Sequence, residues 1–264
     1  MPNGFLIAFW GLLGTAVGSF LNVAASRLPE RRSILHPPSH CPACKRELSP
    51  ADLVPIVSYI ALGGRCRTCG ARIPARSLLV ELGTGLLFAL ATWRIDPTAL
   101  QDALTLLLTS VYLSALVVIT VTDLEHGLIL NAVTFPAIGL ALVSAALDGA
   151  ASGGWSDVVY RIGGGVIGAG VIALIILLVP HGMGWGDAKL AGFIGLATGL
   201  PGVLFALFLG FVSGGLVAGS LLLSGRRQTG ETIPLGPFLA LGGTIVLLFE
   251  RELIDGFQWL SAVI

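Results

Sequence analysis

The chain has 264 residues, of which 55% are hydrophobic and only 11% are charged, and its mean hydropathy is +0.90. Soluble domains carry about 25% charged residues, so this composition excludes an ordinary soluble protein and indicates an integral membrane protein. The formal net charge is zero, and we expect the lipid bilayer, and no nucleic acid, as its surroundings.

Basic residues are concentrated in one segment near the N-terminus. Nine of the 15 Lys and Arg residues lie between Arg27 and Arg76, against three acidic residues, Glu30, Glu47 and Asp52. Short basic loops stay on the cytoplasmic side of a membrane, so this segment is predicted to be cytoplasmic and the N-terminus to lie outside. The first apolar segment has no basic residue before it, and we interpret it as a retained helix rather than a signal peptide.

Apolar segments that can cross a bilayer follow one another along the chain. We therefore expect an all-α polytopic membrane protein with about eight transmembrane helices, divided into a first helix (1–26), a cytoplasmic loop (27–77) and a larger transmembrane domain (78–264). The expected spans are residues 5–25, 78–94, 99–121, 131–148, 160–180, 188–200, 203–223 and 233–249. The span 188–200 is short, and the sequence Gly-Leu-Pro-Gly at 199–202 predicts its end.

Two aspartates fall at equivalent depths in this topology. Eight crossings from an outer N-terminus place the connections 122–130 and 181–187 on the same cytoplasmic side. Asp123 ends one apolar helix, and Asp187 ends the glycine-rich stretch 182–187 that precedes another. Ionisable residues at membrane depth usually mark a functional site. Two carboxylates at one depth could meet, so Asp123 and Asp187 are candidates for one shared functional site.

The glycines beside Asp187 suit a substrate whose backbone must come close. Gly184 and Gly186 carry no side chain, and we predict that they bind an extended peptide. Two other interpretations remain open at this point. Asp187 could be a solvated residue of a flexible loop, or the chain could be a nonenzymatic transporter or assembly scaffold whose aspartates bind ions.

Four cysteines form two C-x2-C pairs in the basic loop. Cys41 and Cys44 are separated by 21 residues from Cys66 and Cys69. Tetrahedral Zn²⁺ takes four thiolates from two tight turns, and a closed shell leaves no position for a catalytic water. We therefore predict a structural zinc ion with these four ligands, rather than a redox pair or a disulfide in a reducing compartment.

The glycine-rich run 163–170 has small residues four positions apart inside an apolar segment. This spacing allows two helices to approach closely, and we assign these glycines to packing rather than to a phosphate-binding loop.

Taken together, these motifs resemble the bacterial type IV prepilin peptidases, which are membrane aspartyl proteases of the GxGD type. The resemblance covers nearly the whole chain. It is carried by the sequences at 18–23 and 27–29, the two C-x2-C pairs, the Leu-Val-Glu-Leu of 79–82, the Asp123 segment, the stretch 182–189 and the sequence at 233–238.

The resemblance implies a bifunctional enzyme of the bacterial inner membrane that serves type IV pili or type II secretion. Such an enzyme cleaves a basic leader from prepilins or pseudopilins at the cytoplasmic face and methylates the new N-terminus with S-adenosylmethionine. The family's catalytic pair corresponds to Asp123 and Asp187. The chain departs from the family at Leu130 and Asn131, where Pro-Asp is common, and a leader peptidase without methyltransferase activity is the remaining alternative.

Overall fold

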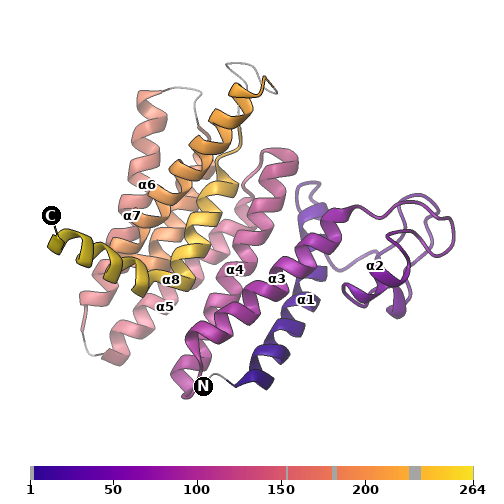
Figure 1. Ribbon diagram of the computed structural model, residues 1–264, viewed down its shortest axis with the longest axis horizontal. Helices are drawn as coiled ribbons and strands as arrows, with labels where there is room; N and C mark the ends of the chain where they lie inside the picture. The colour runs from indigo at the N-terminus through magenta and orange to yellow at the C-terminus, as the bar shows by residue number, and fades with distance from the viewer. Residues whose placement is uncertain (1–2, 153, 180–182, 226–232, 264) are drawn as a thin grey trace. The chain divides into compact units, whose positions relative to one another are not determined.

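The computed structural model describes residues 3–152, 154–179, 183–225 and 233–263. Its regular elements in these ranges are helical, apart from two isolated β-bridges in the loop that follows α1 (Figure 1). They are α1 (Gly4–Arg27), η1 (Pro50–Asp52), α2 (Val57–Ala61), α3 (Ala75–Ile95), α4 (Leu100–His126), α5 (Asn131–Ser152), α6 (Ser156–Leu178), α7 (Trp185–Leu223) and α8 (Gly236–Val263).

The expected all-helical membrane architecture is confirmed. Within the described ranges, six helices are long and apolar enough to cross a bilayer: α1, α3, α4, α5, α6 and α7. Helix α7 contains two of the expected spans, because Gly199 (φ 69°, ψ −164°) and Leu200 (φ −98°, ψ 138°) leave the helical conformation where the Gly-Leu-Pro-Gly sequence predicted an end. Helix α8 begins at Gly236, inside the last expected span of 233–249, and bends at Phe249.

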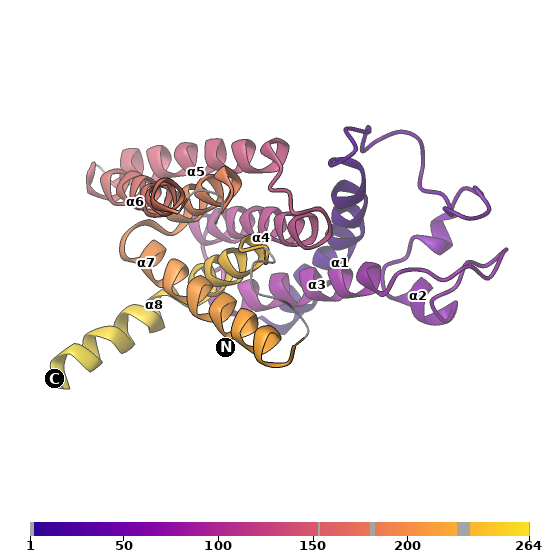
Figure 2. The same ribbon diagram turned by 90° about the horizontal axis from the view of Figure 1, so that it is seen from above.

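The chain divides into two compact units, residues 1–118 and 119–264. In the first unit, α1 and α3 lie side by side and run antiparallel, as Figures 1 and 2 show. Glycines of α1 make this approach possible: a β-carbon at Gly14 would lie 2.8 Å from Phe88 Cβ, and one at Gly18 would lie 2.8 Å from Glu81 Cα. The Trp10 indole also donates a hydrogen bond to Ser110 Oγ, at 2.9 Å.

In the second unit, α7 packs against both α6 and α8, and α5 also contacts α6 and α7. The prediction that the 163–170 glycines serve packing is confirmed for three of them. A β-carbon at Gly164 would clash with Gly195 O of α7, at 2.5 Å, one at Gly165 would clash with Leu196 Cγ, at 2.6 Å, and one at Gly168 would clash with Ala191 O, at 2.5 Å.

Helix α6 offers a matched test of this packing. Gly168→Val should lower the free energy of unfolding by about 1–3 kcal/mol, because the added side chain overlaps the backbone of α7. Gly170→Val should have a much smaller effect, since a β-carbon at Gly170 has no neighbour within 4 Å. Thermal unfolding of the purified variants in detergent measures both, and equal losses would contradict the packing assignment.

Candidate active site and metal centre

Asp123 lies in the last turn of α4, where the apolar helix ends. Gly127 stops the helix in a left-handed conformation (φ 62°), and its N–H donates to Asp123 O at 2.9 Å. The Asp123 side chain is turned inward, and the residue is only 6% exposed. Its Oδ2 is buried and accepts no hydrogen bond from any described residue. Such an unpaired buried carboxylate oxygen is costly unless another group, such as a substrate, occupies the site.

Asp187 lies in the first turn of α7, at the N-terminal end of a helix, whereas Asp123 lies at the C-terminal end of one. Its Oδ2 accepts a hydrogen bond from the Gly184 N–H at 3.1 Å, and its own N–H donates to Gly184 O at 3.0 Å. The positive end of the helix dipole favours a carboxylate in this position. Asp187 is 8% exposed, whereas Gly184 and Trp185 are exposed.

The fold brings the two carboxylates together, although 64 residues separate them in the sequence. Their negative charges are close enough to repel one another. Ile129 lies between the two segments. A β-carbon added at Gly186 would lie 2.9 Å from Ile129 Cβ, and one added at Gly236 would lie 3.2 Å from Ile129 Cδ1. A β-carbon at Gly236 would also lie 2.5 Å from Asp123 Oδ2, so the start of α8 closes the site against this carboxylate.

Other polar residues near the pair are placed away from it. Glu125 and His126 are exposed at the end of α4. Lys189 Nζ donates to Asn131 Oδ1 at 2.6 Å and lies 5.6 Å from the Phe135 ring centroid. Asn131, where the sequence departs from the resembled family, is therefore held by Lys189. Gly182, the first residue of the predicted glycine-rich stretch, lies outside the described residues.

The four cysteines of the loop converge on one point. Their Sγ atoms all lie within 4.8 Å of one another, and the thiols are free. Cys41 and Cys69 are 3.8 Å apart, and Cys44 and Cys66 are 4.0 Å apart. Four sulfurs around a tetrahedral zinc with Zn–S bonds of about 2.3 Å would be about 3.8 Å apart, so the arrangement fits the predicted ion.

Each C-x2-C pair is held in the same type of turn. Cys41 N–H donates to Arg46 O and Lys45 N–H donates to Cys41 O, at 2.9 Å each. In the second turn Cys66 N–H donates to Ala71 O and Gly70 N–H donates to Cys66 O, at 2.8 and 3.0 Å. Backbone N–H groups of Cys69 and Thr68 lower the pKa of Cys66 to about 6. The second turn therefore favours the thiolate of Cys66, whereas at Cys69 the Ala71 backbone contact is outweighed by burial and hydrogen bonds to the other cysteines, which raise the pKa of Cys69 to about 11.

A buried carboxylate joins the two turns independently of the metal. Asp52 Oδ2 accepts from Arg46 Nη2 at 2.7 Å and from Ser49 Oγ at 2.8 Å, and Asp52 Oδ1 accepts from Arg67 Nε at 2.8 Å. Arg46 follows the first turn and Arg67 belongs to the second. The hydrogen bonds from Arg67 and Ser49 hold the pKa of the Asp52 carboxyl well below its usual range.

Comparison with known proteins decides the family. Residues 12–95 match the model of the bacterial peptidase A24 N-terminal domain, and residues 110–219 match the model of the type IV leader peptidase family. A Bacillus subtilis protein named prepilin leader peptidase/N-methyltransferase is 32% identical over 247 residues, which cover 92% of this chain and 94% of the relative. This chain belongs to the type IV leader peptidase family.

Other relatives of this leader peptidase carry the same name. The Pseudomonas aeruginosa protein is 32% identical over 273 residues (92% of this chain, 90% of the relative), and the Pseudomonas putida protein is 31% identical over 280 residues (96% and 94%). No solved structure matches the chain. The family recognised from the motifs is thus confirmed, while the individual roles predicted for Asp123, Asp187, Gly184 and Gly186 stay predictions.

Sequence reasoning did not single out three residues that shape this leader peptidase. Gly236 lies against Asp123, Ile129 lies between Gly186 and Gly236, and Asp52 joins the cysteine turns. Gly236 belongs to a motif that carried the family resemblance, but nothing in its neighbourhood indicates that it lies against Asp123. Asp52 is an acidic residue in a strongly basic loop, which is a signal that an ion-pair argument could have used.

The metal site yields a direct test. Purified protein should contain about one zinc per chain, and replacing Cys41 and Cys66 together with Ser should release it, because two of four ligands are lost. His40→Ala should retain the zinc, since His40 lies beside Cys41 but outside the cysteine cluster. Metal analysis by mass spectrometry measures both variants. Active wild-type protein without zinc would contradict the assignment.

The Asp52 contacts yield a second test in the same loop. Asp52→Asn should speed proteolysis of the segment 28–74 several-fold at pH 7, because charged hydrogen bonds to two arginines are weakened. A carboxyl whose pKa is lower in the folded protein stabilises the fold at pH values above its pKa in the unfolded chain. This stabilisation is lost as the pH falls towards its pKa in the folded protein. The wild-type loop should therefore remain protected at pH 5. Glu47→Gln, an exposed change of the same kind, should leave proteolysis unchanged.

Proposed function

We propose that this chain cleaves the leader peptide of prepilins or pseudopilins with Asp123 and Asp187 as the catalytic pair, and then methylates the new N-terminal amine. The observation that carries the proposal is that the fold brings two buried carboxylates together beside an exposed glycine. The family and the names of the relatives support both activities.

Peptide hydrolysis needs an acid and a base close together, and the pair supplies both. Two adjacent carboxylates cannot both ionise at low cost, so one keeps its proton. The ionised carboxylate takes a proton from a water molecule as the water oxygen bonds to the scissile carbonyl carbon. The protonated carboxyl donates a hydrogen bond to the carbonyl oxygen. The C–N bond then breaks, and the leaving amine takes a proton from the pair.

The glycines around Asp187 give a peptide access to this chemistry. Gly184 is exposed, and a β-carbon there would meet only Asp187 Oδ2, at 3.7 Å, and Gly186 N, at 3.8 Å. A substrate backbone can therefore pass beside Gly184 and reach Asp187 directly. Gly186 has a second role, because its missing side chain makes room for Ile129. We place this site at the cytoplasmic face, with the N-terminus outside, on the basis of the basic loop.

The cysteine loop serves the methyl-transfer half of the proposal. Its zinc would be held by Cys41, Cys44, Cys66 and Cys69 in a closed shell, so the metal orders the loop and takes no part in chemistry. S-adenosylmethionine supplies the methyl group, and the acceptor is the amine freed by cleavage. The loop and the aspartate pair belong to different compact units, so we expect the two activities to be separable by mutation.

The alternatives predict different results. A transporter or scaffold would neither cleave nor methylate a prepilin, and a leader peptidase without the second activity would cleave only. Incubation of purified protein with a candidate prepilin and S-adenosylmethionine, followed by mass spectrometry, reports the loss of the leader and the gain of one methyl group separately. The protein is expected to produce both changes.

Substitution of the aspartates tests the catalytic assignment. Asp123→Asn and Asp187→Asn should each reduce leader cleavage at least a thousandfold, because either change removes one of the two groups that share a proton. Both variants should fold, since an amide is close in shape to a carboxyl. The measurement is the initial cleavage rate of a purified prepilin, with thermal unfolding as the check on folding.

Asn131→Asp is the control for this experiment. It adds a carboxylate near the same helix ends, where Lys189 is already positioned to pair with it. Cleavage should remain within about twofold of the wild type, because the contribution of such an exposed ion pair is small. Substantial cleavage by a folded Asp123→Asn or Asp187→Asn variant would remove that residue from the catalytic pair.

A further inference from the structure

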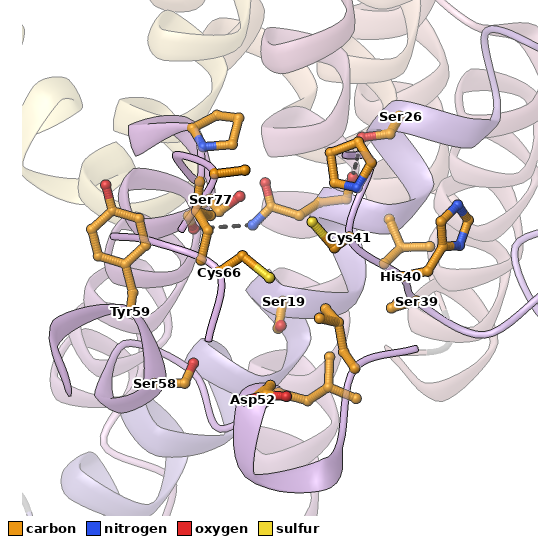
Figure 3. A pocket seen from close by; sticks show the side chains of 18 of the residues that line it. Ser19, Ser26, Ser39, His40, Cys41, Asp52, Ser58, Tyr59, Cys66 and Ser77 are labelled. Atoms are coloured by element: carbon orange, nitrogen blue, oxygen red, sulfur yellow. Dashed lines mark hydrogen bonds between the residues drawn. The ribbon is translucent and has the colours of Figure 1, made fainter. Parts of the chain in front are cut away.

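A cavity of about 470 Å³ lies where the cysteine loop meets the ends of α1 and α3, all within the first compact unit (Figure 3). Its size is typical of small-molecule sites, which span about 300–1,000 Å³. Helix α1 contributes Asn22 to the lining, α2 contributes Tyr59, and α3 contributes Glu81. The cysteine cluster contributes its two buried members, Cys41 and Cys66.

Asn22 brings a hydrogen-bond acceptor to this cavity. The residue is 8% exposed, and its Nδ2 donates to Ser77 O at 3.0 Å, a bond that Figure 3 draws as a dashed line. This bond fixes the orientation of the amide, because only the nitrogen side can donate to a carbonyl. Asn22 Oδ1 is buried and has no hydrogen-bond partner among the described residues. A bound molecule with an N–H group would satisfy it.

Glu81 brings a negative charge to the same wall. Asn22 of α1 contacts Ser77 of α3, and Gly18, one turn earlier in α1, contacts Glu81, one turn later in α3. The two helices are antiparallel, so Asn22 and Glu81 lie about one helical turn apart. Glu81 is 8% exposed, and no ion pair links it to a described Lys or Arg. Arg76, the nearest arginine in sequence, donates instead to Ser26 Oγ at 2.7 Å. A buried carboxylate without a cation favours a positively charged ligand.

The loop residue that holds Glu81, Ile56, has a strained backbone conformation. Glu81 Oε2 accepts a hydrogen bond from the Ile56 N–H at 2.8 Å. Ile56 is a β-branched residue with φ 62° and ψ −52°, and it is the centre of a γ-turn in which Val57 N–H donates to Pro55 O. This conformation is rare and strained for such a residue. Strain of this kind is retained where the surrounding structure fixes a binding site.

We propose that this cavity binds S-adenosylmethionine, with the Glu81 carboxylate and the Asn22 carbonyl oxygen holding its ammonium group. This inference rests on the proposed methyltransferase function. S-adenosylmethionine carries an ammonium and a sulfonium, which suit a carboxylate without an ion pair to a described residue beside an acceptor without a hydrogen bond. It also carries a carboxylate, which suits the arginines that line the same cavity. Tyr59 offers an aromatic face to the adenine. Cys41 and Cys66 belong to the wall, so zinc binding fixes the shape of the cavity.

Direct binding to the full-length protein tests this site. Titration calorimetry with S-adenosylmethionine should show binding to the wild type and a loss of affinity of about tenfold or more in Glu81→Gln, because a charge-assisted contact is removed. Asn22→Leu should also weaken binding. Glu47→Gln removes the same charge from an exposed part of the loop outside the cavity, and its affinity should equal that of the wild type.

Three further readouts separate the possible failures. Zinc content and leader cleavage should stay at wild-type levels in Glu81→Gln, which would show that the variant is folded. Ultraviolet crosslinking of labelled S-adenosylmethionine should mark peptides containing Tyr59 or residues 76–81. If the wild type neither binds S-adenosylmethionine nor methylates a prepilin, the proposed function itself is wrong.

If the wild type binds and methylates but both cavity variants bind normally, the site lies elsewhere and the inference is overturned. Normal binding together with lost methylation in Glu81→Gln would also overturn it, since the cavity would then hold the acceptor amine rather than the methyl donor.

Discussion

Burying a carboxylate among apolar helices is the constraint on which the rest of this structure depends. In the described parts of the membrane-spanning helices, three acidic residues are buried: Glu81, Asp123 and Asp187. Each lies against a glycine of a neighbouring segment or turn, namely Gly18, Gly236 and Gly184. A glycine allows a backbone to come close enough to cover a charged group and leaves space beside it. The glycines thus bury the charge and keep room for a ligand.

Under the proposed function, the two activities belong to different parts of the chain. Asp123, Asp187, Ile129 and Gly236 belong to the second compact unit, whereas the cysteine cluster and the cavity lined by Glu81 belong to the first. The residues named for the aspartate pair all lie in one unit, and those named for the cysteine cluster and the cavity all lie in the other. The proposed chemistry also differs: hydrolysis by the aspartate pair would require a carboxylate that keeps a proton, whereas the proposed contact of Glu81 with an ammonium would require a negative charge. A single site would have difficulty meeting both requirements.

The sequence predicted most of the helices and the neighbourhood of Asp123 and Asp187, because hydropathy defines spans and the number of crossings decides which connections share a side. The break at Gly199 was predictable for a local reason, the following Leu-Pro-Gly. The contact of Gly236 with Asp123 and the γ-turn at Ile56 were not predictable. Both depend on tertiary contacts between distant segments, and a β-branched residue at positive φ runs against its own local preference.

The two cysteine turns share one hydrogen-bond pattern but differ at the residue that closes each of them. Gly70 (φ 69°) takes the left-handed conformation without cost, whereas Lys45 (φ 59°) takes it as an ordinary L-residue, which costs about 1–2 kcal/mol. Before metal arrives, the turn around Cys66 and Cys69 is therefore the better preorganised half. A metal ion bound by the four cysteines should be captured there first, and the turn around Cys41 and Cys44 should close over it second, which gives the loop a defined order of assembly.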